Sequence, residues 1–363
     1  MHSVLGGGTD ARIHVYDLEA TRSLVKRKAP VVARADKNNG HKFSVTGVSW
    51  YPGDTGIFTS CSTDRTIRVW DTNSMQVACT FNMKEKVYIH CMSSIASNSA
   101  LIAAGGESNY VRLCDLRTGD HAQMLSGHNG PVTGISWSRT EEYVLATGSR
   151  DDTIRIWDIR KSRSCLADLT KRDSPPSTAF SATKSTSTAF KKSASMPPPP
   201  PKHNAILGLA YTTSGSHLLS LKLDGTFDIW SAYDFAHVRT HAIDPSTHFG
   251  NDLNAIVPVM LQVGASVVHQ DLVVVPSVGD SWRGIGVYEV HSGRRVSLLR
   301  GHFLRSACVA ARQETQQLIS GGFDGEVLCW SPQFMRESWI GDDDPSFEAA
   351  LRDAWSDEED GGS

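Results

Sequence analysis

Two sets of side chains in this sequence have the chemistry of a serine hydrolase. The sets are His128, Ser149 and Asp151 and, earlier in the chain, His41, Ser62 and Asp64. An imidazole placed between a carboxylate and a hydroxyl could activate that hydroxyl as a nucleophile. Each set, however, is followed at the same interval by a tryptophan, Trp157 or Trp70, so the trio belongs to a repeated unit. A trio that recurs in a repeat is typical of a structural turn, and we expect no catalytic residue in either set.

The repeated unit closes with an aspartate (a serine in one copy), five further residues and an aromatic residue or cysteine. Its copies lie at residues 10–17, 64–71, 108–115, 151–158, 224–231 and 324–331, with a degenerate copy at 286–289. The residues before the aromatic one alternate between apolar and polar, as in Thr66–Trp70, which predicts a strand with one buried face. A Gly-His pair, here Gly127-His128, followed about thirty residues later by Trp-Asp is the signature of a four-stranded propeller blade. Seven copies predict an all-β protein, a seven-bladed WD40 β-propeller.

Within a blade, the trio is expected to hold the turn before the third strand. The histidine would hydrogen-bond the aspartate. Ser149 or Ser62, two residues before that aspartate, would bridge to the indole N–H of Trp157 or Trp70. Three further histidines are expected to open other blades in the same way, namely His90, His203 and His302.

The first blade is expected to be incomplete. Only Val4-Leu5 precedes the Gly6–Asp10 turn, so this blade would lack its innermost strand. The sequence also suggests no N-terminal strand to complete the last blade and close the ring. We therefore expect an open ring with unpaired strand edges, which folded proteins normally avoid. We interpret this start as a shortened chain or a misannotated gene start.

The predicted propeller spans residues 1–340 and is interrupted once. At about residues 166–202 the chain becomes rich in Ser, Thr, Lys and Pro, and this segment ends in the proline run Pro197–Pro201. Such a segment cannot bury enough apolar surface to offset its ordering entropy, so we expect a disordered insert between two blades. The proline run is either a stiff spacer or a ligand for SH3 or WW domains.

Residues 341–363 form an acidic C-terminal tail with a helical pattern. Phe347, Leu351 and Trp355 are spaced by four residues, which predicts one apolar face of a short helix. That face either binds a groove of a partner or packs back on the propeller; a further alternative is that the tail is frayed. Ser356 precedes a run of acidic residues and is a candidate site for an acidophilic kinase.

Composition excludes several classes of function. The net charge of −3 over 363 residues does not favour a nucleic-acid-binding surface, so we expect no direct sequence-specific contact with nucleic acid. The seven cysteines lack metal-ligand spacing, and no phosphate-binding or dinucleotide fingerprint occurs. No run of eighteen apolar residues is present. We expect a protein that is not an enzyme and that uses no cofactor, metal or membrane.

Several segments outside the repeat consensus point to a particular family. They are Ser44–Ser60, Val69–Asn73, Val111–Leu116 and, in the tail, Phe347-Glu348 with Asp353–Glu359. The run Trp50-Tyr51-Pro52-Gly53-Asp54-Thr55-Gly56 and the Ala-Trp-Ser-acidic tail are not general features of propeller repeats. With these segments the chain resembles the Cockayne syndrome group A family of WD-repeat proteins. The resemblance spans the chain apart from the Ser/Pro-rich insert.

The resemblance implies a docking site for the triple-propeller adaptor of a cullin-4 ubiquitin ligase. Its residues would be Trp157, Asp158 and Arg160 of a Trp-Asp-x-Arg box, and Asp115 and Arg117 of a second copy that has cysteine in place of tryptophan. Both arginines would project from one rim of adjacent blades and offer their N–H groups to carboxylates or carbonyls. The alternative is that they are ordinary solvated arginines. Family members also carry an N-terminal helical segment that contributes to adaptor binding, and this chain begins after it.

The resemblance further implies a nuclear, non-catalytic substrate receptor in transcription-coupled nucleotide excision repair. Its partners would be the ligase adaptor, a repair ATPase of the Cockayne syndrome group B type and RNA polymerase II. The alternative function is a general WD40 scaffold for a nuclear chromatin or RNA-processing complex without ligase attachment. We expect charge reversal at Arg160 and Arg117 to discriminate between the two.

Overall fold

The computed structural model describes the chain in thirteen segments. They are residues 3–17, 26–28, 31–34, 40–52, 54–95, 100–161, 165–169, 204–243, 259–263, 270–276, 284–304, 306–312 and 316–331. Within these segments the regular structure consists of strands β1 to β27, without an α-helix. No helix long and apolar enough to span a membrane occurs in them. The acidic tail, with Ser356 and the Phe347–Trp355 pattern, lies outside the described residues.

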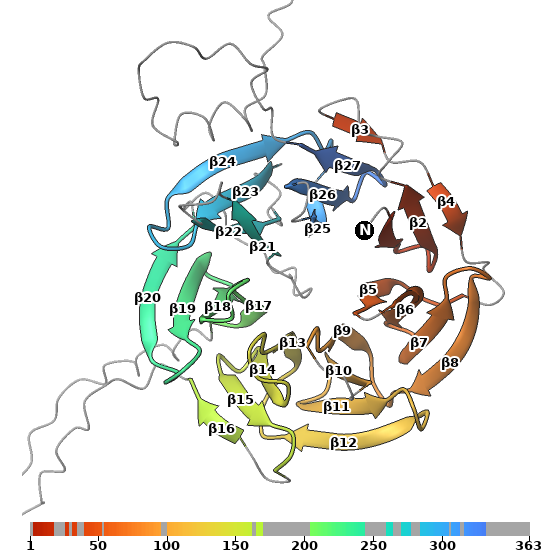
Figure 1. Ribbon diagram of the computed structural model, residues 1–363, viewed down its shortest axis with the longest axis horizontal. Coiled ribbons are helices and arrows are strands. Elements are labelled where there is room, and N and C mark those ends of the chain that lie inside the picture. Colours follow the sequence, from red (N-terminus) through yellow and green to blue (C-terminus); the bar gives the residue numbers. More distant parts are fainter. Residues whose placement is uncertain are drawn as a thin grey trace, which may run out of the picture.

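The strands form sheets that follow one another around a ring (Figure 1). The first three sheets are β1 (Ser3–Gly7), β2 (Ile13–Asp17) and β4 (Val31–Arg34); β5 (Val45–Tyr51), β6 (Asp54–Ser62), β7 (Thr66–Asp71) and β8 (Gln76–Asn82); and β9 (Val87–Met92), β10 (Leu101–Gly106), β11 (Tyr110–Asp115) and β12 (Asp120–Ser126). The next two are β13 (Val132–Trp137), β14 (Val144–Ser149), β15 (Ile154–Asp158) and β16 (Cys165–Asp168); and β17 (Ile206–Tyr211), β18 (His217–Lys222), β19 (Thr226–Ser231) and β20 (His237–Ala242). The last two are β21 (Val259–Val263), β22 (Gln270–Val275), β23 (Gly284–Glu289) and β24 (Arg295–Arg300); and β25 (Ser306–Arg312), β26 (Gln317–Gly322), β27 (Val327–Trp330) and β3 (Lys26–Lys28).

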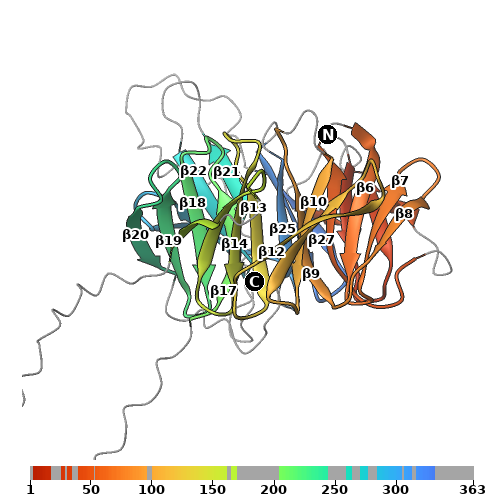
Figure 2. The ribbon, with the colours of Figure 1, turned by 90° about the horizontal axis from the view of Figure 1, so that it is seen from below.

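Neighbouring strands of each sheet are antiparallel, and most are joined by short turns, which a parallel pair could not use. In β14 and β15, for example, Leu145 pairs with Trp157 and Thr147 with Arg155. Figure 2 shows the ring from the side, with the strands running between its two faces. Each sheet therefore has one end on each face of the ring. The all-β propeller expected from the repeat is confirmed.

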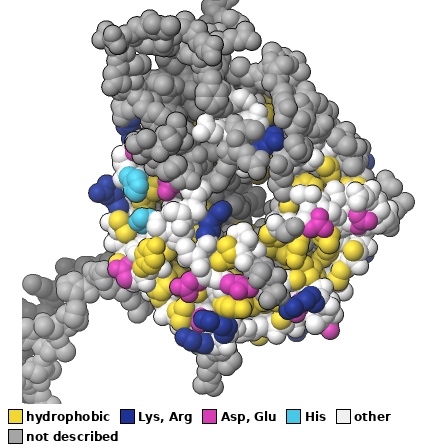
Figure 3. Space-filling model, viewed as in Figure 1, with side chains coloured by type: hydrophobic (Ala, Val, Ile, Leu, Met, Phe, Trp, Pro, Cys, Tyr) yellow, Lys and Arg dark blue, Asp and Glu magenta, His cyan; other side chains and the backbone are white. Residues whose placement is uncertain are grey.

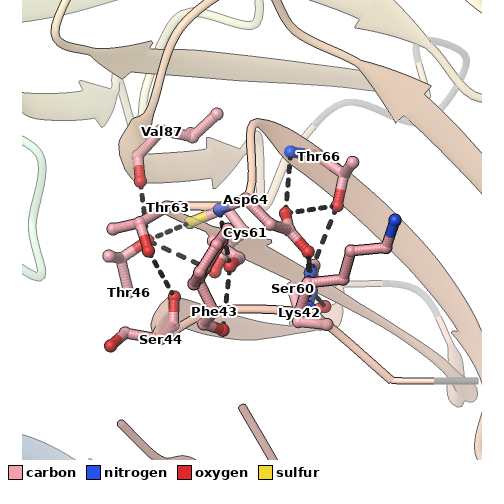
Figure 4. A network of polar contacts seen from close by, with 12 residues as sticks. Lys42, Phe43, Ser44, Thr46, Ser60, Cys61, Thr63, Asp64, Thr66 and Val87 are labelled. Atoms are coloured by element: carbon pink, nitrogen blue, oxygen red, sulfur yellow. Dashed lines mark hydrogen bonds and ion pairs between the residues drawn. The ribbon is translucent and has the colours of Figure 1, made fainter. Parts of the chain in front are cut away.

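The core lies between the faces of adjacent sheets. Ile89 and Leu113 of the third sheet pack against Val132 and Leu145 of the fourth, and all four side chains are buried. Full burial of one such side chain stabilises the fold by about 1.5–3 kcal/mol. Polar contacts add to this packing near the channel, where the Thr46 hydroxyl donates to the carbonyl of Val87 in the next sheet at 2.8 Å (Figure 4). The ring is thus held together sheet by sheet.

The first sheet confirms one expectation and corrects another. Among the described residues it has three strands, and β1 pairs with β2 alone, so the innermost strand is missing as expected. The last sheet, however, is complete, because β3 pairs with β27 as its outer strand. The expectation that no strand closes the last blade was therefore wrong. The chain leaves the first sheet after β2, pairs with β27 and returns as β4, which satisfies backbone groups that β27 would otherwise expose.

The expected insert also begins later than its predicted boundary. Residues Cys165–Asp168, which straddle the predicted start at residue 166, form β16, the outer strand of the fourth sheet. Leu169 is buried against the core of that sheet and the next. The Ser/Thr-rich composition begins after these residues, so composition alone placed the boundary too early. The rest of the insert, including Pro197–Pro201, lies outside the described residues.

Candidate partner-docking site

The Ser/His/Asp sets form hydrogen-bond networks within the sheets. In the second sheet His41 Nδ1 lies 2.9 Å from Asp64 Oδ2, and His41 Nε2 lies 2.7 Å from Ser60 Oγ. The indole N–H of Trp70 donates to the same Ser60 oxygen at 2.8 Å. Figure 4 shows Ser60, Asp64 and the loop residues around them. The network joins the core to the turn between β6 and β7, as the repeat pattern predicts.

The hydroxyl in the network is not the predicted one. Ser60 bridges histidine and tryptophan in the second sheet, and Thr147 does so in the fourth, with 2.8 Å to His128 Nε2 and 2.7 Å to the Trp157 indole nitrogen. The predicted residues, Ser62 and Ser149, instead accept the backbone N–H of the aspartate two residues later. Ser62 and Ser149 are the last residues of β6 and β14, beside the turn. The indole of each tryptophan instead bonds the residue two positions earlier in that strand, Ser60 or Thr147. Ser62 and Ser149 therefore stabilise the turn and do not hydrogen-bond the tryptophan.

Other sheets repeat or modify the network. In the last sheet His302, Ser320, Asp324 and Trp330 make the same set of contacts, so the expectation for His302 is confirmed. In the fifth sheet Asn204 bonds Asp224. The predicted residue was the neighbouring His203, which lies outside the described residues. His90 was also misassigned. It lies in β9, where its ring contacts Thr59 and Cys61 of the preceding sheet.

The carboxylates of Asp64 and Asp151 hold the turns before the third strands in place through hydrogen bonds. Burial alone would raise the pKa of Asp64 and Asp151, but hydrogen bonds from a histidine, a threonine and a backbone N–H outweigh it. The pKa of each carboxyl therefore lies well below its usual range. Both aspartates are ionised at neutral pH and anchor the loop that carries the histidine. The hydroxyls are buried and already bonded, so the trios hold structure in place.

The Trp-Asp-x-Arg box lies at the opposite end of the fourth sheet, where β15 ends. The guanidinium of Arg160 grips the Asp158 carboxylate with two bonds, Nε to Oδ1 at 2.9 Å and Nη2 to Oδ2 at 2.8 Å. The backbone N–H of Arg160 also donates to Asp158 Oδ1. The Arg160 side chain remains 58% exposed, whereas that of Asp158 is 4% exposed. Since Arg160 hydrogen-bonds Asp158, the pKa of that carboxyl is lowered to about 2.

An aromatic ring completes the surroundings of Arg160. The guanidinium carbon lies 4.9 Å from the centroid of the Tyr143 ring, within the range of a cation–π contact. Tyr143 precedes β14, and its carbonyl accepts the backbone N–H of Ile159 at 3.1 Å. The two ends of the hairpin are thereby joined beneath the arginine. No feature of the sequence pattern singled out Tyr143, because it is distant from the box along the chain.

The second copy of the box is much looser. The backbone N–H of Arg117 bonds Asp115 at 2.9 Å, but the side-chain Nε lies 3.7 Å from Asp115 Oδ1, beyond hydrogen-bond distance. The side chain of Arg117 is 65% exposed, and Asp115 is more exposed than Asp158. Cys114, at the position of the box tryptophan, is buried. The two boxes therefore present arginines in different states.

Both arginines lie on the same face of the ring. Each follows the third strand of its sheet, β11 or β15, and these two sheets are adjacent. Trp157 and Asp158 are buried, so within the box Arg160 is the side chain that a partner can reach. Figure 3 shows one face of the ring, on which basic and acidic side chains lie among apolar ones. Tyr233, which follows the third strand of the fifth sheet, is exposed at the same end, so the arginines lie on a face that offers polar and apolar contacts.

The other face also carries exposed apolar side chains, among them three phenylalanines. Phe323 lies in an aspartate turn, and Phe43, Phe303 and Leu304 lie in the loops that carry the histidines, all at the strand ends opposite Arg160 and Arg117. The backbone N–H of Phe303 donates to Asp324 at 2.9 Å, so the buried network holds this loop. A cavity of about 510 Å³ lies beside Phe43, between the first and second sheets. Among the described residues, no group of histidine, cysteine or acidic side chains could hold a metal ion.

Comparison with known proteins agrees with this architecture. Residues 36–71 and 119–158 match the family described as WD domain, G-beta repeat. The chain is 30% identical to WD repeat-containing protein ATCSA-1 of Arabidopsis thaliana, over 98% of this chain and 87% of that protein. It is 23% identical to Radiation-sensitive protein 28 of Saccharomyces cerevisiae, over 53% of this chain and 39% of the yeast protein. A ribosome biogenesis protein WDR12 homolog of Chlamydomonas reinhardtii is 35% identical over 33% of this chain and 28% of its own length. The repeats, the propeller and the similarity to ATCSA-1 over nearly the whole chain show that this protein belongs to the WD-repeat family.

Proposed function

We propose that this protein is a non-catalytic substrate receptor that links a cullin-4 RING ubiquitin ligase to transcription-coupled nucleotide excision repair. The observation that supports this most strongly is the Arg160–Asp158 fork at an exposed sheet end, in a box of the form Trp-Asp-x-Arg. The similarity to ATCSA-1 over most of both chains agrees with the resemblance to the Cockayne syndrome group A family. The name of the yeast relative, Radiation-sensitive protein 28, agrees with a role in repair.

In this proposal the two faces of the ring have separate tasks. The face with Arg160 and Arg117 binds the triple-propeller adaptor. The opposite face, with Phe303 and Phe323 exposed on two loops that Asp324 joins, binds the substrate or a repair partner. Exposed apolar groups on a rigid loop are typical of protein contacts. The receptor transfers nothing itself and acts by raising the effective concentration of target lysines near the ubiquitin carrier.

The expected cellular partners follow from the same proposal. They are a repair ATPase of the Cockayne syndrome group B type and RNA polymerase II, and the place of action is the nucleus. We count the three-stranded first sheet as the seventh blade, with its inner strand missing among the described residues. The acidic tail and Ser356 would serve these partner contacts, in line with the acidic run that follows Ser356.

A second candidate function is a general scaffold without ligase attachment. It is favoured by the match to the WDR12 homolog, which covers a third of this chain and whose name refers to ribosome biogenesis. The two functions differ in whether the Arg160 face binds the cullin-4 adaptor. A scaffold of this kind would keep its fold and its opposite face but would have no need of either arginine.

Charge reversal of both arginines discriminates between the two functions. We expect Arg117→Glu with Arg160→Glu to reduce co-purification of the adaptor at least about tenfold, because the acceptors on the adaptor would face carboxylates. The matched control is Arg65→Glu with Lys84→Glu, two exposed positions on the opposite face, which should leave binding unchanged. Undiminished adaptor recovery with the first double variant, or none with the unchanged chain, would contradict the proposed function.

A further inference from the structure

We propose that Arg160, held between Asp158 and Tyr143, recognises an uncharged oxygen acceptor such as a main-chain carbonyl, whereas Arg117 recognises a carboxylate. The inference rests on the proposed docking function and adds the chemistry that the partner must offer at each point. It also gives Tyr143 a role as a positioning residue for Arg160. The N–H groups that each arginine has available decide which acceptor it can bind.

Part of the hydrogen-bonding capacity of the Arg160 guanidinium is already taken by Asp158. The guanidinium has five N–H donors in a planar fork, and Asp158 accepts from Nε and from Nη2. The remaining donors point away from Asp158, and 58% of the side chain is exposed to receive a partner. Asp158 is 4% exposed and also accepts the backbone N–H of Arg160, so it cannot turn aside to release the guanidinium. The donors that a partner meets are therefore fixed in direction before docking.

Charge around Arg160 is largely cancelled. Asp158 neutralises the guanidinium, Lys161 Nζ lies 3.8 Å from the same carboxylate, and Glu141 lies close enough to act on Arg160. A second carboxylate would lose its hydration and would meet the field of Asp158, so its attraction to Arg160 would be small. A carbonyl carries no net charge and accepts two N–H donors at little desolvation cost. The site around Arg160 therefore favours an uncharged acceptor.

Tyr143 controls the plane of the fork. Its ring lies under the guanidinium, with 4.9 Å between the guanidinium carbon and the ring centroid. The Tyr143 carbonyl accepts the N–H of Ile159, so the ring and the box are tied to the same strand end. Stacking on an aromatic face restrains an arginine in a way that an aliphatic side chain does not. An aromatic residue at position 143 is therefore needed for full binding, whereas its hydroxyl is not.

Arg117 has the opposite properties. In the part of the chain that the structure describes, its guanidinium donates no hydrogen bond, and its Nε is 3.7 Å from Asp115 Oδ1. With 65% of the side chain exposed, all five donors are available for a two-point contact with a carboxylate. Asp115 is itself more exposed than Asp158, so water screens its charge more strongly. Arg117 should therefore supply the charge-dependent part of docking.

The salt dependence of adaptor binding tests this division. We would measure the Kd of the purified adaptor by calorimetry at about 0.05 M and about 0.5 M salt, since screening acts on charge pairs and much less on neutral contacts. Arg117→Gln should weaken binding about tenfold at low salt and about twofold at high salt. Arg160→Gln should weaken it by a similar factor, about tenfold, at both. If Arg160→Gln instead flattens the salt dependence as much as Arg117→Gln, the inference is wrong while the proposed function stands. If neither variant weakens binding, the proposed function itself fails.

Two further variants test the positioning of Arg160. Tyr143→Phe keeps the aromatic face and should leave Kd within about twofold, whereas Tyr143→Leu should weaken binding about fivefold without changing the salt dependence. Asp158→Asn leaves Arg160 with an uncompensated charge and should make binding more salt-dependent than in the unchanged chain. Thermal unfolding of each variant separates loss of the contact from loss of the fold. Equal effects of Phe and Leu at position 143, or an unchanged salt dependence in Asp158→Asn, would overturn the assignment.

Discussion

The third and fourth sheets lie side by side, yet they hold their strands together by different chemistry. The fourth sheet uses His128, Thr147 and Trp157, joined by hydrogen bonds. At the equivalent positions the third sheet has Met83, Ala104 and Cys114, which belong to or pack against one apolar cluster. Ser108 replaces the turn aspartate. The network has thus been replaced as a unit.

The difference shows that a buried polar network is costly to change one member at a time, whereas the fifth sheet keeps the Trp230–Ser220 bond with Asn204 in place of the histidine. A tryptophan indole, a hydroxyl and an imidazole satisfy one another, and removal of one leaves the others buried without a partner. An apolar trio of smaller volume avoids that cost but gives up the bond to the turn. The same contrast appears at the other end of the two sheets, where Arg160 is fixed and Arg117 is not.

The largest effect is expected when one member of the network is exchanged alone. Trp157→Cys introduces the residue of the third sheet, and we expect it to lower the free energy of unfolding by about 3–5 kcal/mol, from the lost ring volume and the unpaired Thr147 and His128. The triple variant His128→Met, Thr147→Ala, Trp157→Cys should be less destabilised than the sum of its single changes, because no polar atom is left unpaired. Urea unfolding measures both. Simple additivity of the three changes would show that the network does not act as a unit.

Loss of the turn aspartate should have the next largest effect, and it depends on pH. Asp151→Asn removes a carboxylate that accepts bonds from the Asn129 backbone and from Thr153, for an expected loss of about 1.5–3 kcal/mol at neutral pH. The pKa of Asp151 is lowered in the folded chain, so its contribution is full above the ordinary carboxyl range near pH 4 and declines as the pH falls below it. The free energy of unfolding should therefore decrease less in the variant than in the unchanged chain when the pH is lowered below about 4. Ser108→Ala, at the matching position in the third sheet, is the control and should change stability by less than about 0.5 kcal/mol at any pH.

The contrast between the two sheets also shows how far sequence reasoning reaches. The Asp-to-Trp spacing located the third strands of the repeats correctly, because alternation and the turn aspartate are local features of the chain. The role of Thr147 in place of Ser149 could not be found in this way, since it depends on how β14 and β15 pair. In the observed register Thr147 pairs with Arg155, which lies two residues before Trp157 on the same face of β15. Knowledge of this register would have identified Thr147.

Two other features depend on contacts that are distant in sequence. The strand Lys26–Lys28 has no alternating pattern, and it pairs with β27 because that edge is available at the point where the ring closes. Tyr143 lies beneath Arg160 because β14 and β15 form a hairpin whose ends meet. Neither residue type nor local spacing predicts these two contacts, because each joins segments that are distant along the chain. The box itself, by contrast, was visible as a motif.

A smaller effect should separate the two hydroxyls that the sequence could not tell apart. Thr147→Val keeps the shape but removes a hydroxyl that contacts both His128 and Trp157, with an expected loss of about 1–3 kcal/mol. Ser149→Ala removes an acceptor for the Asp151 backbone N–H alone and should cost about 0.5–1.5 kcal/mol. The comparison is made by urea unfolding at neutral pH. A larger loss for Ser149→Ala would restore the original assignment of the bridging hydroxyl.

The smallest effects are expected at the docking end, and they decide how binding data can be interpreted. Arg160 and Arg117 are both more than half exposed, so replacing either by Gln should leave the free energy of unfolding close to that of the unchanged chain, with Arg117→Gln the smaller change. The Arg160 change should nevertheless be visible in one titration. Because Arg160 lowers the pKa of Asp158 to about 2, its removal should return that carboxyl toward its ordinary value, which NMR can follow. An unchanged pKa of Asp158 would mean that the fork does not persist in solution. If the fork persists and stability is unaltered, a loss of adaptor binding in Arg160→Gln reports the contact itself, and the difference between the two arginines becomes a difference in recognition.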